Sequence, residues 1–218
     1  MNRDVALQSL TLATSDGVSL EAERAVPADT SRATVVLCHP HPQYGGTMRS
    51  IVIGALFDAL PDAGFTVLRF NFRGVERSTG THDEGRAELL DVHAAVDAAA
   101  EARTAPRGGA GEPLVLTGWS FGADMTLATH DDRIAAWIGI APPLRFRTDF
   151  DAVAHDARPK LLVLGQHDEF RAPESVVEAT ADWNATELDV IAGASHFFVG
   201  RTDRVVDAVR AFVERVVG

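Results

Sequence analysis

PLVLTGWSFGADMTLA, residues 113–128, is the stretch of sequence that decides the fold. Its first residues form a short apolar run, which is typical of a strand buried on both faces of a parallel sheet. Gly118-Trp119-Ser120-Phe121-Gly122 comes next, and a run that fits the start of a helix, ADMTLA, follows it. The stretch therefore predicts a buried strand, a sharp turn and a helix, in that order.

The Gly-x-Ser-x-Gly pattern at such a turn predicts a serine nucleophile whose Oγ is raised above the sheet. Ser120 must adopt a strained backbone conformation for this, and side chains at positions 118 and 122 would collide with the neighbouring strand and helix. The alternative is an incidental serine in a glycine-rich turn. The strand before it and the helix after it favour the nucleophile.

A serine hydroxyl of ordinary acidity is a poor nucleophile, so the turn predicts an acid and then a histidine further along the chain. Asp168 follows the run KLLVLG (160–165), and His196 follows the last short strand, 188–191. We predict that His196 takes the proton from Ser120 and that Asp168 orients the imidazole. Glu169 is the alternative acid, but Asp168 is nearer to the strand end. An isolated, solvent-facing loop histidine is the alternative for His196.

An oxyanion hole needs two backbone N–H donors, and the residue after the nucleophile, Phe121, supplies the first. The second must come from the loop CHPHPQYGG (38–46), whose two prolines have no N–H to donate. His41 is the best candidate, with Gln43 and Tyr44 as alternatives.

The same loop holds His39 and His41 in a His-x-His pattern, which raises the question of a metal. A catalytic zinc needs about three protein ligands, and no matching histidine or carboxylate pair stands nearby in the sequence. We therefore expect no metal and no cofactor, and we interpret the pattern as a structural anchor of the loop.

Outside this stretch, the chain alternates short apolar runs with longer helical segments. Residues 5–14 and 18–26 predict an antiparallel hairpin around Asp16-Gly17. Helical stripes run through Leu89, Val92, Val96 and Ala99 and through Val205, Val209, Phe212 and Val216. The remaining predicted strands are TVVLC (34–38), FTVLRF (65–70), IAAWIGI (134–140) and KLLVLG (160–165).

This alternation predicts the α/β class, with a doubly wound, mostly parallel sheet and an N-terminal antiparallel hairpin. Ligands of such sheets bind beyond the carboxyl ends of the strands. Residues 104–113 are interpreted as a turn rather than a linker, because core strands continue on both sides. We predict one domain over residues 1–218.

The composition narrows the function classes. The 218 residues include 46% hydrophobic and 23% charged residues, as one compact domain requires. The formal net charge of -11 argues against a nucleic-acid partner. One cysteine excludes an intrachain disulfide, and neither a secretory signal nor a membrane span is evident, so we expect a cytoplasmic protein.

Five blocks together resemble the α/β-hydrolase superfamily, and more narrowly its small bacterial members related to dienelactone hydrolases and carboxylesterases. The resemblance implies the α/β-hydrolase fold and places Ser120, Asp168 and His196 on the catalytic triad positions. The blocks are HPHPQYGGTM (39–48), LRFNFRGVERSTG (68–80), GWSFGA (118–123), GQHDEF (165–170) and GASHFFVGR (193–201).

Two features depart from that family pattern. Glu76 stands where such members usually have glycine in a turn, and Ser120 stands where dienelactone hydrolases have cysteine, which argues against that particular activity. Arg73 and Gly74 in the same turn are candidates for binding an anionic substrate, but a structural role is the favoured interpretation.

Residues 141–159 are too few for the helical cap that many relatives insert, so we expect no cap domain and an open site. A small-molecule acyl ester is the expected partner; the oligomeric state is left open. The expected apolar walls and substrate-binding residues are Tyr44, Trp119, Leu144, Phe146, Phe150, Phe197 and Phe198.

The function predicted from these residues is a serine hydrolase that cleaves small to medium acyl esters through an acyl-enzyme on Ser120. A thioesterase, an acyltransferase or a peptidase would use the same triad. A non-catalytic binding protein on the same scaffold is the alternative from another class, since fold does not fix function.

Overall fold

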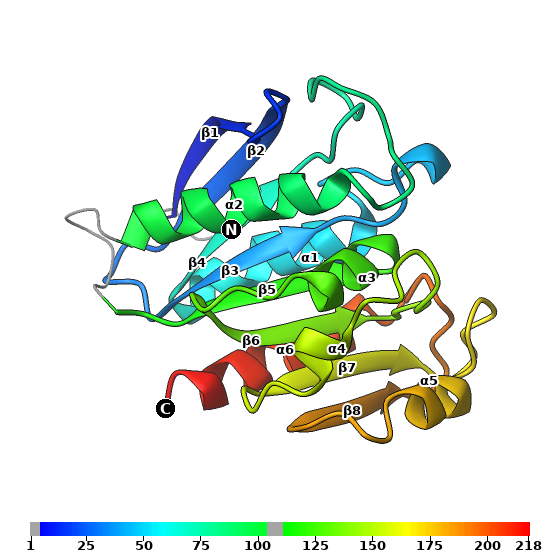
Figure 1. Ribbon diagram of the computed structural model, residues 1–218. Helices are drawn as coiled ribbons and strands as arrows, with labels where there is room; N and C mark the ends of the chain where they lie inside the picture. Colours follow the sequence, from blue (N-terminus) through cyan, green and yellow to red (C-terminus); the bar gives the residue numbers. More distant parts are fainter. Residues whose placement is uncertain (1–4, 104–110) are drawn as a thin grey trace.

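The computed structural model describes residues 5–103 and 111–218. These residues form one eight-stranded sheet in the spatial order β1-β2-β4-β3-β5-β6-β7-β8 (Figure 1). The strands are β1 (Ala6–Ala13), β2 (Ser19–Val26), β3 (Ala33–Cys38), β4 (Phe65–Phe70), β5 (Leu114–Trp119), β6 (Ile134–Ile140), β7 (Lys160–Gly165) and β8 (Thr186–Ile191).

The sheet is mostly parallel, with an antiparallel hairpin at one edge. β1 pairs antiparallel with β2, and β2 pairs antiparallel with β4. All other neighbouring strands are parallel. The predicted α/β class and N-terminal hairpin are confirmed.

The central strands are buried because helices cover both faces of the sheet. Every residue of β3, β5 and β7 is buried, as the uninterrupted apolar runs predicted. The edge strand β8 differs, because four of its six residues are exposed. It begins at Thr186, two residues before the predicted start.

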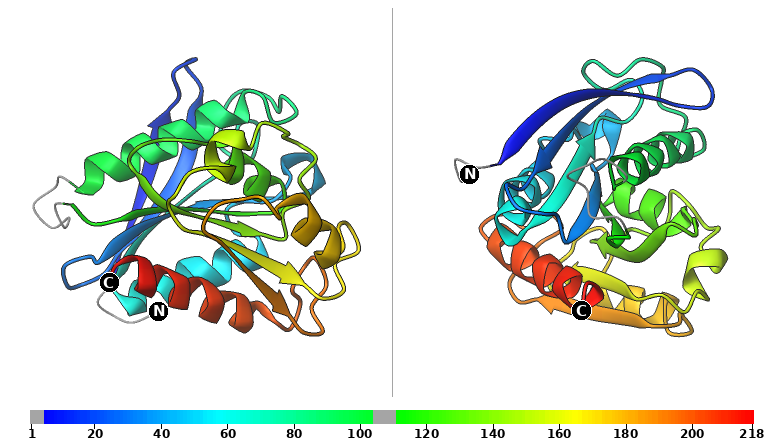
Figure 2. Two further views of the ribbon diagram at one scale, coloured as in Figure 1. Left: turned by 60° about the horizontal axis from the view of Figure 1, so that its bottom comes forward. Right: turned by 90° about the vertical axis from the view of Figure 1, so that its left-hand side faces the viewer.

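The helices lie in two layers, α1 and α6 on one face of the sheet and α2, α3, α4 and α5 on the other (Figures 1 and 2). Both predicted helical stripes turn their apolar side chains to the sheet. The α-helices are α1 (Ile51–Ala59), α2 (Glu88–Arg103), α3 (Phe121–Ala128), α4 (Asp151–Ala154), α5 (Pro173–Ala179) and α6 (Thr202–Val216), with 3₁₀ turns η1 (Pro42–Tyr44) and η2 (Leu60–Ala63).

The connections leave the carboxyl ends of the strands uncovered. Residues 141–159, between β6 and β7, contain only the four-residue helix α4. This agrees with the prediction that the segment is too short to form a cap domain. Most of the predicted turn at 104–113 lies outside the described residues. Across residues 5–103 and 111–218, no helix has the length and apolar character needed to cross a bilayer.

Candidate active site

The turn between β5 and α3 holds Ser120 in a strained conformation, with φ 55° and ψ -119°. A Cβ on Gly118 would lie 2.0 Å from the carbonyl oxygen of Gly122, and a Cβ on Gly122 would lie 2.3 Å from that of Cys38. Both glycines are therefore needed where β5, α3 and β3 approach, as the sequence predicted. The Ser120 N–H donates to the carbonyl of Ile140 at 2.8 Å, which ties the turn to β6.

Three polar side chains from distant parts of the chain meet beside this turn. His196 Nε2 lies 2.9 Å from Ser120 Oγ, and His196 Nδ1 lies 2.8 Å from Asp168 Oδ2. Because a carboxylate only accepts, Nδ1–H donates to it, and the bare Nε2 accepts the serine hydroxyl. The side chains of Asp168 and His196 are 4% and 6% exposed, so water competes little with these bonds.

The loop after β7 positions Asp168. β7 ends at Gly165, where a Cβ would lie 2.6 Å from the carbonyl oxygen of Ser195, so glycine lets the histidine-bearing loop approach the strand end. The other carboxylate oxygen of Asp168, Oδ1, accepts the N–H groups of Phe170 and Arg171 at 2.9 and 3.1 Å. One oxygen therefore fixes the loop and the other faces the imidazole.

Two side chains hold the backbone of His196. Glu169 Oε2 accepts the His196 N–H at 3.1 Å, and the Trp119 indole N–H donates to the His196 carbonyl at 3.2 Å. Glu169, the alternative acid, thus contacts the backbone of His196, whereas Asp168 contacts the ring. Sequence reasoning missed this backbone contact, since no pattern signals it.

The loop after β3 separates the three candidates for the second oxyanion donor. Gln43 N–H donates to His41 Nδ1 at 3.2 Å, and Tyr44 N–H donates to the His41 carbonyl at 3.1 Å. Within the described chain, the N–H groups of His41 and Phe121 have no hydrogen-bond acceptor. These two donors therefore remain available, while both alternatives are already engaged.

His39 and His41 have different surroundings. His39 is fully buried, its Nδ1–H donates to the Pro40 carbonyl at 2.6 Å, and its Nε2 accepts the Phe72 N–H at 3.0 Å. Burial lowers the pKa of His39 to about 3. His41 is partly buried, and burial and the nearby His82 and Arg145 lower its pKa to about 4.

The two nitrogens of His39 are thus both engaged, which fits the interpretation of the loop anchor. Among the residues that the structure describes, no three His, Cys, Asp or Glu side chains are grouped as ligands of a metal ion.

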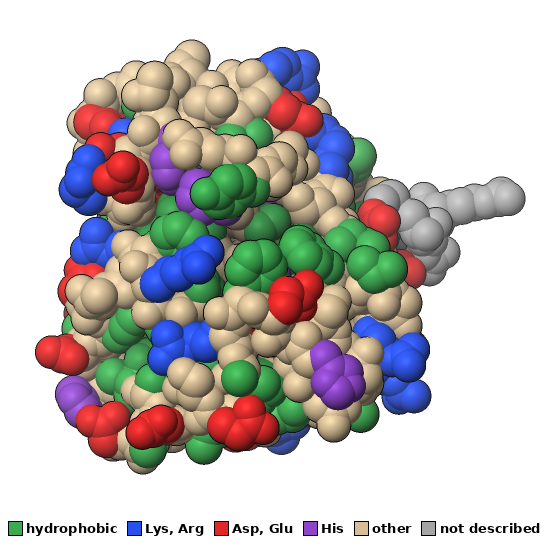
Figure 3. All heavy atoms as spheres, turned by 90° about the vertical axis from the view of Figure 1, so that its right-hand side faces the viewer, with side chains coloured by type: hydrophobic (Ala, Val, Ile, Leu, Met, Phe, Trp, Pro, Cys, Tyr) green, Lys and Arg blue, Asp and Glu red, His purple; other side chains and the backbone are tan. Residues whose placement is uncertain are grey.

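A pocket of about 510 Å³ opens beside Ser120 and His196. It lies at the carboxyl ends of the strands, where a space-filling view shows hydrophobic side chains gathered with Lys or Arg side chains beside them (Figure 3). Its lining consists of Pro40, His41, Tyr44, Gly45, Gly46, Ser50, Ile51, Trp119, Ser120, Pro143, Arg145, Phe146, Phe170, His196 and Phe197.

The pocket lining differs from the predicted walls at three positions. Leu144 and Phe150 line a separate surface hollow with Trp183, and Phe198 is fully buried in the core beneath α6. Leu144 and Phe198 have positive φ values of 50° and 51°. Such a backbone turns a side chain away from the direction that alternation along the chain suggests. Tyr44, Trp119, Phe146 and Phe197 do line the pocket.

Sequence reasoning missed several lining residues, above all Phe170 and Arg145. Phe170 follows Asp168 by two residues, so its place in the same strand-end loop was the available signal. Its ring centroid lies 4.6 Å from that of His196. Arg145 adjoins Phe146, which was predicted, but nothing in the sequence shows that it lacks an acidic partner.

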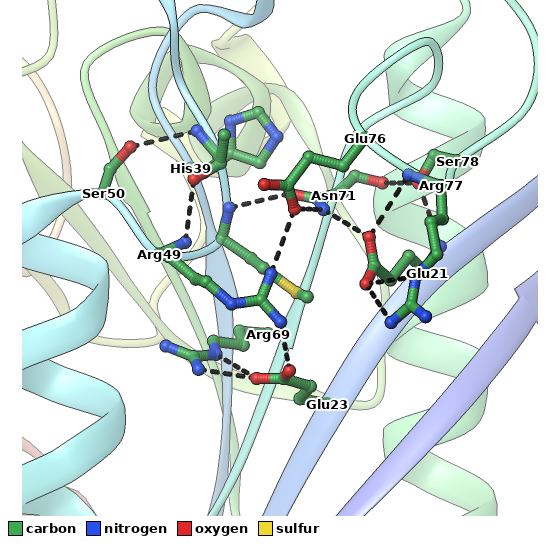
Figure 4. Close-up of polar contacts among 12 residues, drawn as sticks. Glu21, Glu23, His39, Arg49, Ser50, Arg69, Asn71, Glu76, Arg77 and Ser78 are labelled. Carbon is green, nitrogen blue, oxygen red and sulfur yellow. Dashed lines mark hydrogen bonds and ion pairs between the residues drawn. The ribbon is translucent and has the colours of Figure 1, made fainter.

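Asn71 holds the loop after β3, part of which lines the pocket, through a hydrogen bond to its backbone (Figure 4). It accepts the Met48 N–H at 2.8 Å, and its amide donates to Glu21 at 2.9 Å and Glu76 at 2.7 Å. Arg49 donates to Glu76 at 3.0 Å. Glu76 has a φ of 48°, which explains why glycine suits this turn, and its carboxylate joins the turn to the loop that lines the pocket.

Arg73 lies in a charged cluster away from the pocket, in which Arg73 and Asp91 are buried and Asp16 is exposed. It is 4% exposed and pairs with Asp91 at 2.7 Å and Asp16 at 2.9 Å. Burial raises the pKa of Asp91, whereas the hydrogen bond from Arg73 lowers that of Asp16 to about 2. Both contacts agree with the structural role favoured for this turn.

Comparison with known proteins is consistent with this geometry. A family model described as an alpha/beta hydrolase domain matches residues 31–212. An uncharacterised protein of Rickettsia prowazekii is 30% identical in an alignment of 204 positions that covers 89% of this chain and 84% of that protein.

Two solved structures are similar in sequence and fold. An alpha-beta serine hydrolase homologue from Coxiella burnetii is 32% identical with a TM-score of 0.81, over 94% of this chain and 96% of that one. A serine hydrolase without a lid from Xanthomonas campestris is 31% identical with a TM-score of 0.82, over 99% of this chain and 96% of that one. The narrower relation to dienelactone hydrolases stays a prediction. The chain belongs to the alpha/beta hydrolase family.

Proposed function

We propose that this protein is a serine hydrolase that cleaves small to medium acyl esters through an acyl-enzyme on Ser120. The observation that carries the proposal is the continuous hydrogen-bonded line from Ser120 Oγ through His196 to Asp168, with distances of 2.9 and 2.8 Å. Family membership and the serine hydrolases among the structural neighbours support hydrolytic activity.

In the first half of the reaction, His196 Nε2 takes the Ser120 proton as Oγ forms a bond to the ester carbonyl carbon. The carbonyl oxygen becomes an oxyanion. The imidazolium then gives its proton to the leaving alcohol as the ester C–O bond breaks, and the acyl group stays on Oγ. Asp168 stabilises the imidazolium and keeps Nε2 directed at the serine.

The second half repeats these steps with water. His196 takes a proton from a water molecule whose oxygen attacks the acyl carbon. The proton returns to Ser120 Oγ as the C–Oγ bond breaks, which releases the carboxylic acid. In both halves the N–H groups of Phe121 and His41 are the proposed donors to the oxyanion, because neither has another acceptor in the described chain.

The pocket supports esters of small to medium size. Its volume of about 510 Å³ lies in the range of small-molecule sites, and most of its walls are aromatic or aliphatic. No cap over residues 141–159 limits access to it. An apolar acyl or alcohol group therefore suits the pocket, with the carbonyl at Ser120.

Rapid-mixing kinetics with p-nitrophenyl acetate, butyrate and octanoate tests this function. An acyl-enzyme that forms faster than it hydrolyses releases a burst of p-nitrophenolate of about one equivalent per active site before the steady state. Thioester and anilide analogues of the best chain length then compare the leaving groups. Absence of turnover with every ester, thioester and anilide would contradict the proposal and favour a binding protein.

A further inference from the structure

Arg145 is the one Lys or Arg among the described residues that line the pocket, and no Asp or Glu lines it. Within the described chain, its guanidinium has no ion pair and no hydrogen-bond acceptor. It contacts aromatic rings instead, with its central carbon 4.9 Å from the Phe146 centroid and 5.9 Å from that of Phe170. The charge of Arg145 acts on the buried Asp124 carboxylate at longer range, but no Asp or Glu of the described chain forms an ion pair with it. The pocket therefore holds a guanidinium whose N–H groups have no acceptor in the described chain.

Two other arginines that are partly or fully buried do form ion pairs. Arg147, two residues further on, pairs with Asp149 and donates to the Gly85 carbonyl at 3.3 Å. Arg73 pairs with two aspartates. The chain carries a net charge of -11, so acidic residues are abundant, yet none of those described forms an ion pair with Arg145.

The backbone that carries Arg145 is held by a buried carboxylate. Asp124 is fully buried, and its two oxygens accept the N–H groups of Leu144, Arg145 and Phe146, each at 2.9 Å. Asp124 lies one turn along α3, the helix that begins directly after Ser120. One short helix therefore fixes both the serine and the turn that presents Arg145.

Arg145 also lies close to the reacting groups. The Phe170 ring is 5.9 Å from its central carbon and 4.6 Å from the centroid of the His196 imidazole. A single aromatic ring thus separates the guanidinium from the proposed base. An anionic group bound there would be a few bonds away from an ester carbonyl at Ser120.

On the basis of the proposed esterase function, we infer that Arg145 is a specificity-determining residue that binds a carboxylate on the substrate, remote from the scissile ester. Guanidinium groups bind carboxylates through paired, charge-assisted hydrogen bonds. A single Arg without a second cation matches a singly charged carboxylate better than a doubly charged phosphate. The preferred substrates are therefore apolar esters that carry one free carboxylate.

Two matched substrate pairs test this inference. In the first, p-nitrophenyl hydrogen adipate and p-nitrophenyl hexanoate differ by a carboxylate at the end of the acyl chain. In the second, 4-acetoxybenzoate and 4-methylphenyl acetate differ by a carboxylate on the alcohol. The kcat/KM ratio of the charged to the neutral ester is measured for the wild type, Arg145→Gln and the control Arg147→Gln.

Arg145→Gln is expected to lower this ratio about tenfold in at least one pair, mainly through KM, because a charged hydrogen bond is lost. The neutral esters report that the site is intact. Arg147→Gln keeps the wild-type ratio, and 0.5 M salt reduces the wild-type ratio. The pair that responds identifies the side of the ester that faces Arg145. A change below threefold in both pairs would overturn the inference.

Failure of the proposed function gives a different result, namely no turnover of any ester by any variant. Equilibrium binding of the intact esters to Ser120→Ala and to Ser120→Ala with Arg145→Gln then decides the inference independently. Tighter binding of the charged ester that is lost with Arg145 supports it. Equal binding of charged and neutral esters by both proteins contradicts it.

Discussion

Two polar clusters lie at the carboxyl ends of the strands. They differ in whether one of their side chains borders the pocket. In one, Asp16 and Asp91 surround the buried guanidinium of Arg73. In the other, Asp168 and His196 lead to Ser120, whose side chain lines the pocket. In the first cluster the side chains of Arg73 and Asp91 are 5% and 0% exposed and only Asp16 reaches solvent, whereas the second ends in a hydroxyl beside the pocket. We propose that the first cluster serves stability and the second serves chemistry.

Removal of the proposed nucleophile should give the largest loss of kcat. It should also distinguish most clearly between a role in chemistry and a role in stability. Ser120→Ala is expected to lower kcat for p-nitrophenyl esters at least about 10⁴-fold, because no hydroxyl remains to form the acyl-enzyme. Its free energy of unfolding, from urea denaturation, should stay within about 1 kcal/mol of the wild type, since Ser120 is only partly buried and the change removes a single hydroxyl. Full turnover by this variant would contradict the proposed catalytic role of the Ser120 cluster.

Asp168→Asn should lower kcat about 10³- to 10⁴-fold, because an amide at this place favours the wrong imidazole tautomer. Its remaining oxygen can still accept the N–H groups of Phe170 and Arg171, so the loop should keep its conformation. Steady-state kinetics measures the loss, and circular dichroism serves as the control for folding. An unchanged kcat would show that Asp168 only fixes the loop.

The opposite behaviour is expected in the cluster around Arg73. Asp91→Ala leaves the Arg73 guanidinium buried with Asp16 alone, which should lower the free energy of unfolding by about 3 kcal/mol. At a temperature where this variant stays folded, its kcat should remain within about threefold of the wild type. Urea denaturation and ester kinetics on the same preparation provide both numbers. A large loss of kcat with unchanged stability would contradict the stabilising role assigned to this cluster.

His39 extends the comparison to two histidines, because its ring is sealed while that of His196 borders the pocket. Burial lowers the folded pKa of His39 from 6.5 to about 3. As the pH falls below 6.5, His39 becomes protonated in the unfolded chain but stays neutral in the folded chain. The free energy of unfolding therefore decreases. The loss should be about 1 kcal/mol between pH 7 and pH 5.5, and about 1.4 kcal/mol for each further unit down to about pH 3.

His39→Gln should remove this part of the pH dependence, since glutamine does not titrate. The quantity to compare is the slope of unfolding free energy against pH, so a lower absolute stability of the variant does not matter. Equal slopes for the two proteins between pH 7 and pH 5 would show that folding does not lower the pKa of His39.

The sequence predicted most of the fold because two strong local signals coincide. Apolar runs marked β3 to β7, and the two helical stripes marked α2 and α6. The helix α1 gave no such signal, since Ile51–Ala59 is apolar on nearly every side. Its place beside α6 on one face of the sheet depends on contacts between residues far apart in the sequence.

The same contrast holds within the site. Ser120, Asp168 and His196 could be located because each follows a recognisable strand and the order of the three is fixed by the motif. The pocket walls could not be located reliably. Phe197 and Phe198 are neighbours, yet one lines the pocket and the other enters the core, because Phe198 has a φ of 51°. A positive φ at a non-glycine residue depends on the surrounding fold.

Active-site labelling with a fluorophosphonate, followed by peptide mass spectrometry, tests most directly whether Ser120 is an activated nucleophile. We predict one adduct per chain, on Ser120, with none on Ser120→Ala and a strongly slowed reaction of His196→Ala, since the imidazole must accept the hydroxyl proton. An adduct on a different residue, or no adduct on a folded wild-type protein, would contradict it.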